Sequence, residues 1–291
     1  MSAAGAPLPE LTHRQIMTVL AGLMLGMLVA ALSQTVVATA LTTIGGELGG
    51  QDKLAWVVSA TLLTSTASTP IWGKLSDLYG RKLLFQVAIG VFLVGSALSG
   101  LAQGIEELIA FRAVQGLGIG GLMALSQAII GDIVAPRERG RYQGYMGSVF
   151  GVATVAGPLI GGFLVDALSW RWCFFVGIPV GVVALAVTER VLRLPFPRHE
   201  HAVDYLGAGL IFGGVSAILL VLSLAGKEFA WASAPTYLLA ALGLALLVAA
   251  VWWERRAPEP IIPPRLFASR TFVLTSIAGF AVGVAMFGGI V

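Results

Sequence analysis

Nine long apolar segments follow one another along the 291 residues, separated by short polar stretches. A helix needs about 20 mainly apolar residues to cross about 30 Å of hydrocarbon, so each segment is a candidate membrane span. Only 11% of the residues are charged and 57% are hydrophobic, which excludes a soluble domain with an ordinary charged surface. The predicted spans are 16–41, 54–72, 83–102, 107–131, 142–165, 172–192, 205–225, 235–253 and 271–291, the last of them unfinished.

The basic residues predict the orientation of these spans. Fourteen of the 18 Lys and Arg residues fall on one side, three fall on the other side, and Arg112 lies within a span. Because cytoplasmic loops carry the excess of positive charge, we expect a cytoplasmic N-terminus. The cations are spread over short loops and form no basic stripe, so we expect membrane lipids as partners and no nucleic acid.

A short charged stretch between the second and third spans is predicted to be a loop. It contains Gly73, Asp77, Gly80, Arg81 and Lys82 in that order. The glycines allow turns and close approach of backbones, and Asp77 can accept hydrogen bonds from Arg81. This order resembles the loop 2–3 signature of the major facilitator superfamily. The resemblance implies a conformational gate that latches the two halves of a transporter in its outward-facing state.

The fourth span carries a charge inside an apolar segment, where a central Arg costs roughly 2.5–3.5 kcal/mol to insert. At about 100° per residue, Arg112, Gln115, Ser126 and Gln127 fall on one face, which is predicted to line a polar cavity. The alternative is an Arg112 near the outer end of the span that extends to water. The segment 111–118 also resembles the helix 4 motif of the superfamily.

The fifth span ends in a segment rich in glycine that resembles the antiporter motif of drug:proton exchangers in the superfamily. Its motif residues are Gly151, Gly157, Pro158, Gly161 and Gly162. Proline permits a bend, and glycines at small-xxx-small spacing allow helices to approach closely. The alternative is a kinked packing helix, as found in any polytopic membrane protein.

The first span is similar to the helix 1 motif of the fourteen-helix drug:proton antiporter branch, over residues 31–44. In that branch an acid commonly occupies the place of Ser33, and a proline that of Thr42. We assign Ser33 and Gln34 to the transport cavity. All 15 acidic residues fall in loops or near span ends, which leaves no carboxylate in mid-membrane. We therefore hypothesise that the first bundle carries no proton-coupling site.

The remaining segments suggest scaffold roles. Trp170, Trp172, Phe174 and Phe175 are interpreted as an outer aromatic belt with no binding role. The two spans within 205–253 carry almost no polar residues, so we expect them to face lipid on both flanks, like the two extra helices of the fourteen-helix branch. The predicted segments are a cytoplasmic N-terminal segment at 1–15, a six-helix bundle at 16–192, cytoplasmic linkers at 193–204 and 254–270, two additional helices at 205–253 and a truncated second bundle from 271.

The predicted fold class is an all-α polytopic membrane protein with a major facilitator fold. The resemblance implies the N-terminal portion of a multidrug exporter in the plasma membrane, with no cofactor other than the proton gradient as energy source. Small hydrophobic or amphipathic compounds are the expected cargo, and the missing C-terminal half of the transporter is an expected partner. The alternatives are an exporter of lipids, peptides or siderophores, and a truncated membrane scaffold or sensor. Neither a catalytic triad nor a cluster of metal ligands occurs in the sequence.

Overall fold

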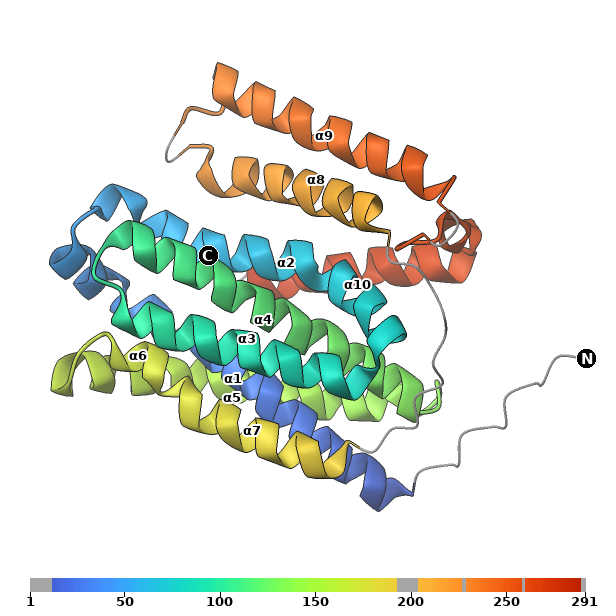
Figure 1. Ribbon diagram of the computed structural model, residues 1–291, viewed down its shortest axis with the longest axis horizontal. Helices are drawn as coiled ribbons and strands as arrows, with labels where there is room; N and C mark the ends of the chain where they lie inside the picture. The colour runs from blue at the N-terminus through green and yellow to red at the C-terminus, as the bar shows by residue number, and fades with distance from the viewer. Residues whose placement is uncertain (1–11, 193–203, 227–228, 258–259, 289–291) are drawn as a thin grey trace, which may run out of the picture.

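The computed structural model describes residues 12–192, 204–226, 229–257 and 260–288. Eight helices within these residues are long and apolar enough to cross a membrane (Figure 1). The predicted all-α polytopic fold with eight full spans is thereby confirmed. The spans are α1 His13–Leu48, α2 Leu54–Tyr79, α3 Arg81–Leu101, α4 Ile105–Ile133, α5 Arg139–Ala167, α6 Trp172–Phe175 together with α7 Gly177–Val191, α8 Tyr205–Leu224 and α9 Ala234–Glu254.

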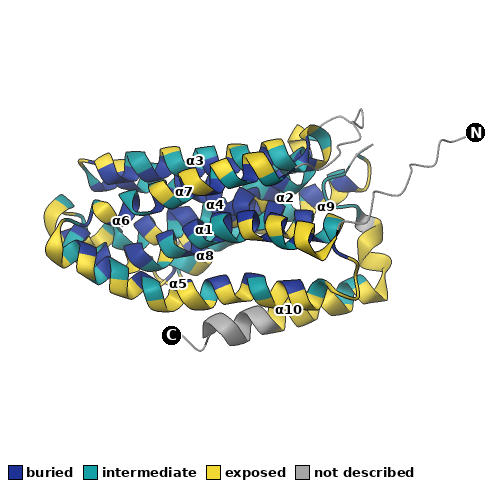
Figure 2. Cartoon of the chain, turned by 90° about the horizontal axis from the view of Figure 1, so that it is seen from below, coloured by how far each residue is buried: buried dark blue, intermediate teal, exposed yellow. Residues whose placement is uncertain are grey.

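Three shorter elements complete the described chain. The 3-10 helix η1, Gln51–Lys53, precedes α2, and η2, Pro264–Ala268, precedes α10, Arg270–Gly288. The described side chains of α10 are mostly exposed, and α10 packs mainly on η2 (Figure 2). Most of the predicted segments 1–15 and 193–204 lies outside the described residues.

The predicted loop at 73–82 is wrong, because most of it is helical. α2 continues to Tyr79 and α3 begins at Arg81, so Gly80 alone separates them. Gly80 has a φ of 96°, a left-handed conformation that glycine adopts at no steric cost. The sequence contains no proline between Pro70 and Gly80, so the helix continues past its apolar part. We call this end of the bundle the Gly80 end.

α4 is the central helix, with α2 and α3 packed along it (Figure 1). At Gly116 a Cβ atom would lie 2.5 Å from the carbonyl oxygen of Thr61, so the approach of α2 requires glycine there. Two α2 hydroxyls also cross to the α4 backbone: Thr61 donates to the carbonyl of Arg112 at 3.1 Å, and Thr64 donates to that of Ala113 at 2.8 Å. α2 and α4 are therefore joined through backbone atoms.

α1 contacts α4, α5 and α7, and its buried face contributes to two apolar cores. One core includes the α1 residues from Ile16 to Ala30 together with side chains near the Gly80 end. The other includes the α1 residues from Val36 to Ile44. The gap between them on α1 contains Ser33, which is buried. The two cores therefore leave room for a polar layer.

The prediction of an outer aromatic belt is wrong for Trp170 and Phe174, which are both buried. Trp170 is fully buried, its indole N–H donates to Glu47 Oε2 at 2.8 Å, and the guanidinium of Arg171 lies 4.3 Å from its ring centroid. The carboxylate partner holds the indole inside this end of the bundle, since a buried indole N–H needs an acceptor. Trp172 is 49% exposed, as a belt residue should be.

α8 and α9 lie side by side against the outside of the bundle (Figure 1). α8 packs on α2 on one side and on α9 on the other. The expectation that both helices face lipid on both flanks is therefore wrong for α8. Its apolar sequence packs against other apolar helices as well as it would face lipid, so hydropathy cannot distinguish the two environments.

Candidate functional site

A polar layer crosses the bundle between the two apolar cores. Arg112 on α4 is only 2% exposed. Its Nε donates to the carbonyl of Val57 on α2 at 3.3 Å, and its Nη1 donates to Gln115 Oε1 at 2.5 Å. The Gln115 amide then donates to the hydroxyls of Ser33 on α1 and Ser96 on α3, both at 3.0 Å. We call these five residues the Arg112 network, which joins four helices.

The charge of Arg112 has neutral partners. Besides the hydrogen bonds, the guanidinium lies 5.9 Å from the ring centroid of Phe174, within the range of a cation–π contact. Within the described part of the chain, no carboxylate forms an ion pair with Arg112. The alternative in which Arg112 extends to water is wrong, because its side chain is enclosed. An enclosed cation inside a membrane bundle is costly, which makes Arg112 a candidate functional residue.

The other residues predicted for the cavity lie apart from this network. Ser126 is buried but donates to the carbonyl of Leu122 in its own helix at 2.6 Å. Gln127 is exposed and accepts a hydrogen bond from the Gln143 amide of α5 at 2.6 Å. Gln34 lies on an exposed side of α1. Ser126 and Gln127 share a face of α4 with Arg112 and Gln115, but Ser126 lies about 21 Å further along the helix than Arg112, at 1.5 Å per residue.

At the Gly80 end, the predicted gate residues form a closed cluster. Arg81 pairs with Asp77 Oδ1 at 2.6 Å, and its Nε donates to Asp132 Oδ2 on α4 at 2.9 Å. Its Nη1 also donates to the Ser76 hydroxyl and, at 3.5 Å, to the carbonyl of Gly73. One guanidinium therefore binds the ends of α2 and α4 to the start of α3.

The second gate cation is paired on the opposite side of α3. Lys82 Nζ lies 3.1 Å from Glu189 Oε1 of α7 and donates to the Glu189 carbonyl at 2.8 Å. The Gln86 amide donates to the same carboxylate. Unlike Arg112, both gate cations have carboxylate partners.

Two glycines of the predicted antiporter motif face α1. A Cβ atom at Gly157 would collide with Thr35, and one at Gly161 would lie 2.8 Å from the carbonyl oxygen of Val36. Beside them, Thr35 donates to the carbonyl of Ala153 on α5 at 3.1 Å. α1 and α5 are therefore in close backbone contact. The other motif residues lie away from α1: Gly151, Pro158 and Gly162.

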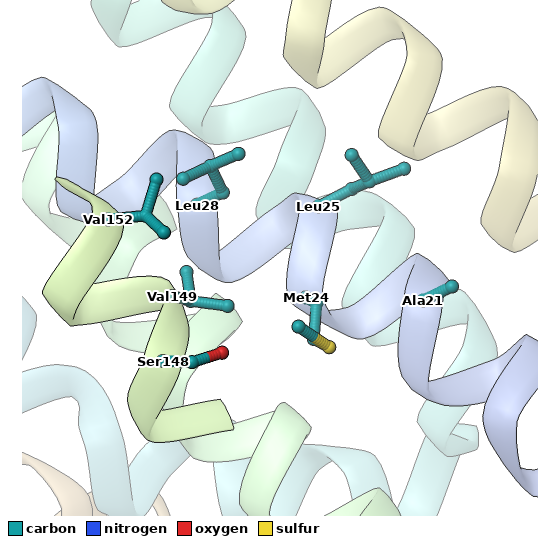
Figure 3. A pocket seen from close by; sticks show the side chains of 7 residues that line it. All are labelled: Ala21, Met24, Leu25, Leu28, Ser148, Val149 and Val152. Atoms are coloured by element: carbon teal, nitrogen blue, oxygen red, sulfur yellow. The ribbon is translucent and has the colours of Figure 1, made fainter. Parts of the chain in front are cut away.

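An apolar groove of about 410 Å³ lies between α1 and α5, toward the Gly80 end (Figure 3). It falls at the small end of the roughly 300–1,000 Å³ range of small-molecule sites. The Ser148 hydroxyl is the only polar side-chain group of the lining and points toward the groove in Figure 3. The lining residues are Ala21, Met24, Leu25, Leu28, Ser148, Val149 and Val152.

Sequence reasoning did not identify several residues of these clusters, among them Val57, Gln86, Ser96, Asp132, Gln143 and Glu189. The two acids lie near helix ends on the side predicted to be cytoplasmic, where most cations gather, which is a usable but unspecific signal. Ser96 and Gln143 gave no signal in a single sequence. No group of three or more His, Cys, Asp or Glu residues capable of holding a metal comes together in the described ranges.

Known proteins with similar sequences include two from Bacillus subtilis. The chain is 40% identical to the multidrug transporter protein MdtP over 269 residues, which are 92% of this chain and 50% of MdtP. It is 38% identical to multidrug resistance protein 3 over 265 residues, which are 91% of this chain and 52% of that protein. The chain thus spans about half the length of these relatives.

Solved structures and a family profile agree with this similarity. An auto-inhibited POT family peptide transporter superposes with a TM-score of 0.57 at 16% identity, covering 82% of this chain and 52% of the other. The human organic anion transporter MFSD10 gives a TM-score of 0.55 at 17% identity, with coverages of 82% and 61%. These structures show a shared fold. The profile of the Major Facilitator Superfamily matches residues 23–205, and the chain belongs to that family.

Proposed function

We propose that this chain is the N-terminal part of a multi-pass exporter of hydrophobic or amphipathic compounds that works by alternating access. The Arg112 network carries the proposal. It places a buried cation with neutral partners between two apolar cores, in a layer shared by four helices. Such a cation can bind an anionic or dipolar group of a passing compound. It can also exchange neutral hydrogen-bond partners when the helices move.

The relatives favour export over other transport. MdtP and multidrug resistance protein 3 are both named for multidrug transport or resistance. Because this chain spans about half of their length, the proposed activity belongs to a protein with a second helical half. Facilitator folds place substrate between two such halves. In this proposal the exposed sides of α1 and α5 face that second half and the surrounding lipid.

The α1–α5 groove supports an apolar cargo. Six of its seven lining side chains are hydrocarbon or thioether groups, and the remaining one is the Ser148 hydroxyl. An apolar lining of this kind binds the apolar parts of compounds with different shapes, because the flexible Met side chain adapts to different ligands. In the proposed exporter this groove receives the apolar part of a compound from the bilayer.

The Gly80 end is proposed to be cytoplasmic and to act as the gate. The charge asymmetry supports a cytoplasmic position for the N-terminus and for this end, in a cell whose plasma membrane holds the exporter. There the ion pairs of Arg81 hold α2, α3 and α4 together, and those of Lys82 hold α3 and α7 together. Breaking them shifts the balance between outward-facing and inward-facing states.

We propose the proton gradient as the energy source, with its coupling acid outside the first bundle. Among the described residues, every carboxylate lies at or near a helix end. The proton is therefore carried by an acid elsewhere in the exporter, or by the substrate. Arg112 stays charged throughout, since guanidinium does not titrate in proteins.

Efflux of an amphipathic fluorescent dye that carries an anionic or dipolar group tests the proposal. Cells that lack their own pumps would express the full-length gene product, its Arg112→Ala variant, or neither. We expect rapid dye loss only with the unchanged protein, and its arrest by a protonophore. If the protein exported lipids, peptides or siderophores but not the dye, the proposed cargo of hydrophobic or amphipathic compounds would be wrong and the exporter would remain. A folded, full-length protein that exports none of them would contradict the transporter and favour a scaffold or sensor.

A further inference from the structure

Two carboxylates meet where α8 begins and α9 ends. Asp204 precedes α8, and its Oδ1 accepts the backbone N–H of Gly207 at 2.8 Å. Both Asp204 oxygens also lie 2.9 Å from the indole nitrogen of Trp253, on the last turn of α9. Asp204 therefore caps α8 and binds the end of α9, at a helix N-terminus that favours one negative charge.

Glu254, the last residue of α9, lies beside this cap. It is 5% exposed, and its Oε2 accepts the backbone N–H of Ile262 at 3.1 Å. Ile262 belongs to the segment 260–263, which has no charged side chain. Glu254 Oε1 is buried and has no hydrogen-bond partner in the described part of the chain. A buried carboxylate oxygen without a partner is costly, so the site lacks one donor at Oε1.

Gly207 shows how close the two carboxylates are. A Cβ atom at this position would lie 2.5 Å from Asp204 Oδ2 and 2.7 Å from Glu254 Oε1, so these two oxygens are no more than 5.2 Å apart. Two carboxylates at this separation, one of them enclosed, are costly to keep charged together. Without a Cβ atom, Gly207 leaves room for both oxygens at the first turn of α8.

The positive charges around Glu254 do not supply the donor that Oε1 lacks. Lys74 of α2 acts on Glu254 electrostatically, but Asp204 acts on it more strongly and with the opposite sign. Arg255 and Arg256, the next two residues of the chain, are exposed. The repulsion between the two carboxylates therefore remains.

A proton fits this site better than a metal ion does. Three of the four carboxylate oxygens of Asp204 and Glu254 already accept N–H bonds, which leaves Oε1 as the one oxygen without a donor. Mg²⁺ and Ca²⁺ require about six or more oxygen ligands. A single proton on Oε1 turns this atom into a donor beside Asp204 and removes one of the two negative charges.

We propose that Asp204 and Glu254 form a proton-binding site that holds one proton at neutral pH, carried by Glu254 Oε1. The bound proton keeps the end of α9, the start of α8 and the segment 260–263 together. When it is lost, two negative charges lie side by side, so the Glu254 side chain moves toward water and releases the Ile262 N–H. The site lies outside the Arg112 network, and its existence does not rest on the proposed function.

Infrared spectroscopy of the full-length protein in lipid measures this proton, because the C=O stretch of a protonated carboxyl group lies apart from that of a carboxylate. Spectra would be recorded from about pH 5 to about pH 9. We expect a protonated-carboxyl band at neutral pH that is missing in Glu254→Gln. Asp166→Asn, which removes an exposed acid, should keep the band. Identical bands in the unchanged protein and in Glu254→Gln would overturn the proposal.

Asp204→Asn gives a second measurement that does not depend on the folding of Glu254→Gln. Asn caps a helix about as well as Asp, so this variant keeps α8 in place while it removes the negative charge beside Glu254. We expect the pH at which the Glu254 band disappears to fall by at least about one unit. An unchanged midpoint would mean that the two carboxylates do not share the proton, and the proposal would be wrong.

Spin labels test what the proton holds together. They would be attached to Leu222→Cys on α8 and Arg265→Cys on η2, both exposed, with Cys173→Ala and no other cysteine in the full-length protein. We expect the distance distribution to become longer or broader as the pH rises through the midpoint of the infrared band. In Glu254→Gln it should not change with pH, because the amide supplies a donor in place of the proton. Distances that stay constant with pH in the labelled protein with Glu254 unchanged would reject the role of the proton in holding the segment 260–263.

Discussion

Two arginines of this bundle lie in opposite environments. Arg112 is 2% exposed, lies between apolar cores and binds a carbonyl, an amide and an aromatic ring. Arg81 has a side chain that is 20% exposed and binds two carboxylates at a helix end. Arg112 therefore has no negatively charged partner among the described residues, whereas Arg81 forms ion pairs with two carboxylates.

The difference indicates what each arginine contributes. A cation near the surface between two carboxylates holds helix ends together. Because water screens these charges, each such ion pair contributes about 0–1 kcal/mol to stability. A buried cation with neutral partners contributes little to stability for its cost. Under the proposed function, this charge serves transport and not stability. Variants of both arginines and of residues near them test this difference.

Arg112→Ala should reduce efflux to the background of cells without the transporter, because it removes the only charge in the polar layer and leaves Gln115 without its charged partner. The measurement is the initial rate of dye loss at matched protein level. Arg112→Lys keeps the charge but loses the planar fork, and an intermediate rate is expected. Unchanged efflux in Arg112→Ala, with normal size-exclusion behaviour, would remove the functional contrast between the two arginines.

Ser33→Asp should give efflux a new dependence on pH. Ser33 is 4% exposed and is linked to Arg112 through Gln115, so an acid there adds a titratable group close to an uncompensated cation. Efflux would be followed from about pH 4, near the ordinary pKa of Asp, to about pH 8. Ser33→Ala removes the same hydroxyl without adding such a group and should leave the shape of the profile unchanged. Identical profiles for all three proteins would indicate that Ser33 does not communicate with the transport step.

Asp77→Asn should shift the gate only modestly toward the inward-open state. Asp77 is 56% exposed, and Arg81 retains Asp132 as a second partner, so we expect a change of up to about fivefold in the ratio of states, from about 1 kcal/mol. Asp77→Asn combined with Asp132→Asn should shift it further. Distances between spin labels across the Gly80 end of the full-length protein would report both. A full opening by Asp77→Asn alone would mean that the second carboxylate is not a partner in solution.

Neutralising the acids at the helix ends should have the smallest effect on proton coupling. Asp132→Asn, Asp166→Asn and Glu189→Gln would be compared for the dependence of efflux on the proton gradient. We expect all three to stay coupled, because these carboxylates lie outside the polar layer. If one variant lost coupling but kept substrate binding and downhill transport, the first bundle would contain the coupling acid after all.

The sequence predicts the parts of the fold that depend on local composition. The eight spans follow from apolar length alone, and the pairing of Arg112 with Gln115 follows from their separation of three residues on a helix. It does not predict that residues 73–79 remain helical, because polar residues continue a helix as readily as they form a loop. The break at Gly80 depends on one left-handed residue.

Contacts between residues that are far apart in the chain could not be predicted from a single sequence. Asp132 is 51 residues from Arg81, and Ser96 is 19 residues from Gln115. Periodicity gives the face on which a side chain lies but not the helix that packs against it. For the same reason Trp170, in a short aromatic stretch typical of a membrane interface, is found inside the bundle with Glu47.

The way in which α2 binds α4 has a consequence for how this protein changes over generations. Thr61, Thr64 and Trp72 of α2 donate to three α4 carbonyls, those of Arg112, Ala113 and Leu117. Every amino acid supplies a carbonyl, so these bonds survive substitution of the α4 side chains beside them. Apart from Gly116 and Gly120, where a side chain would collide with α2, α4 residues can therefore change without removing the hydrogen bonds that join the two helices.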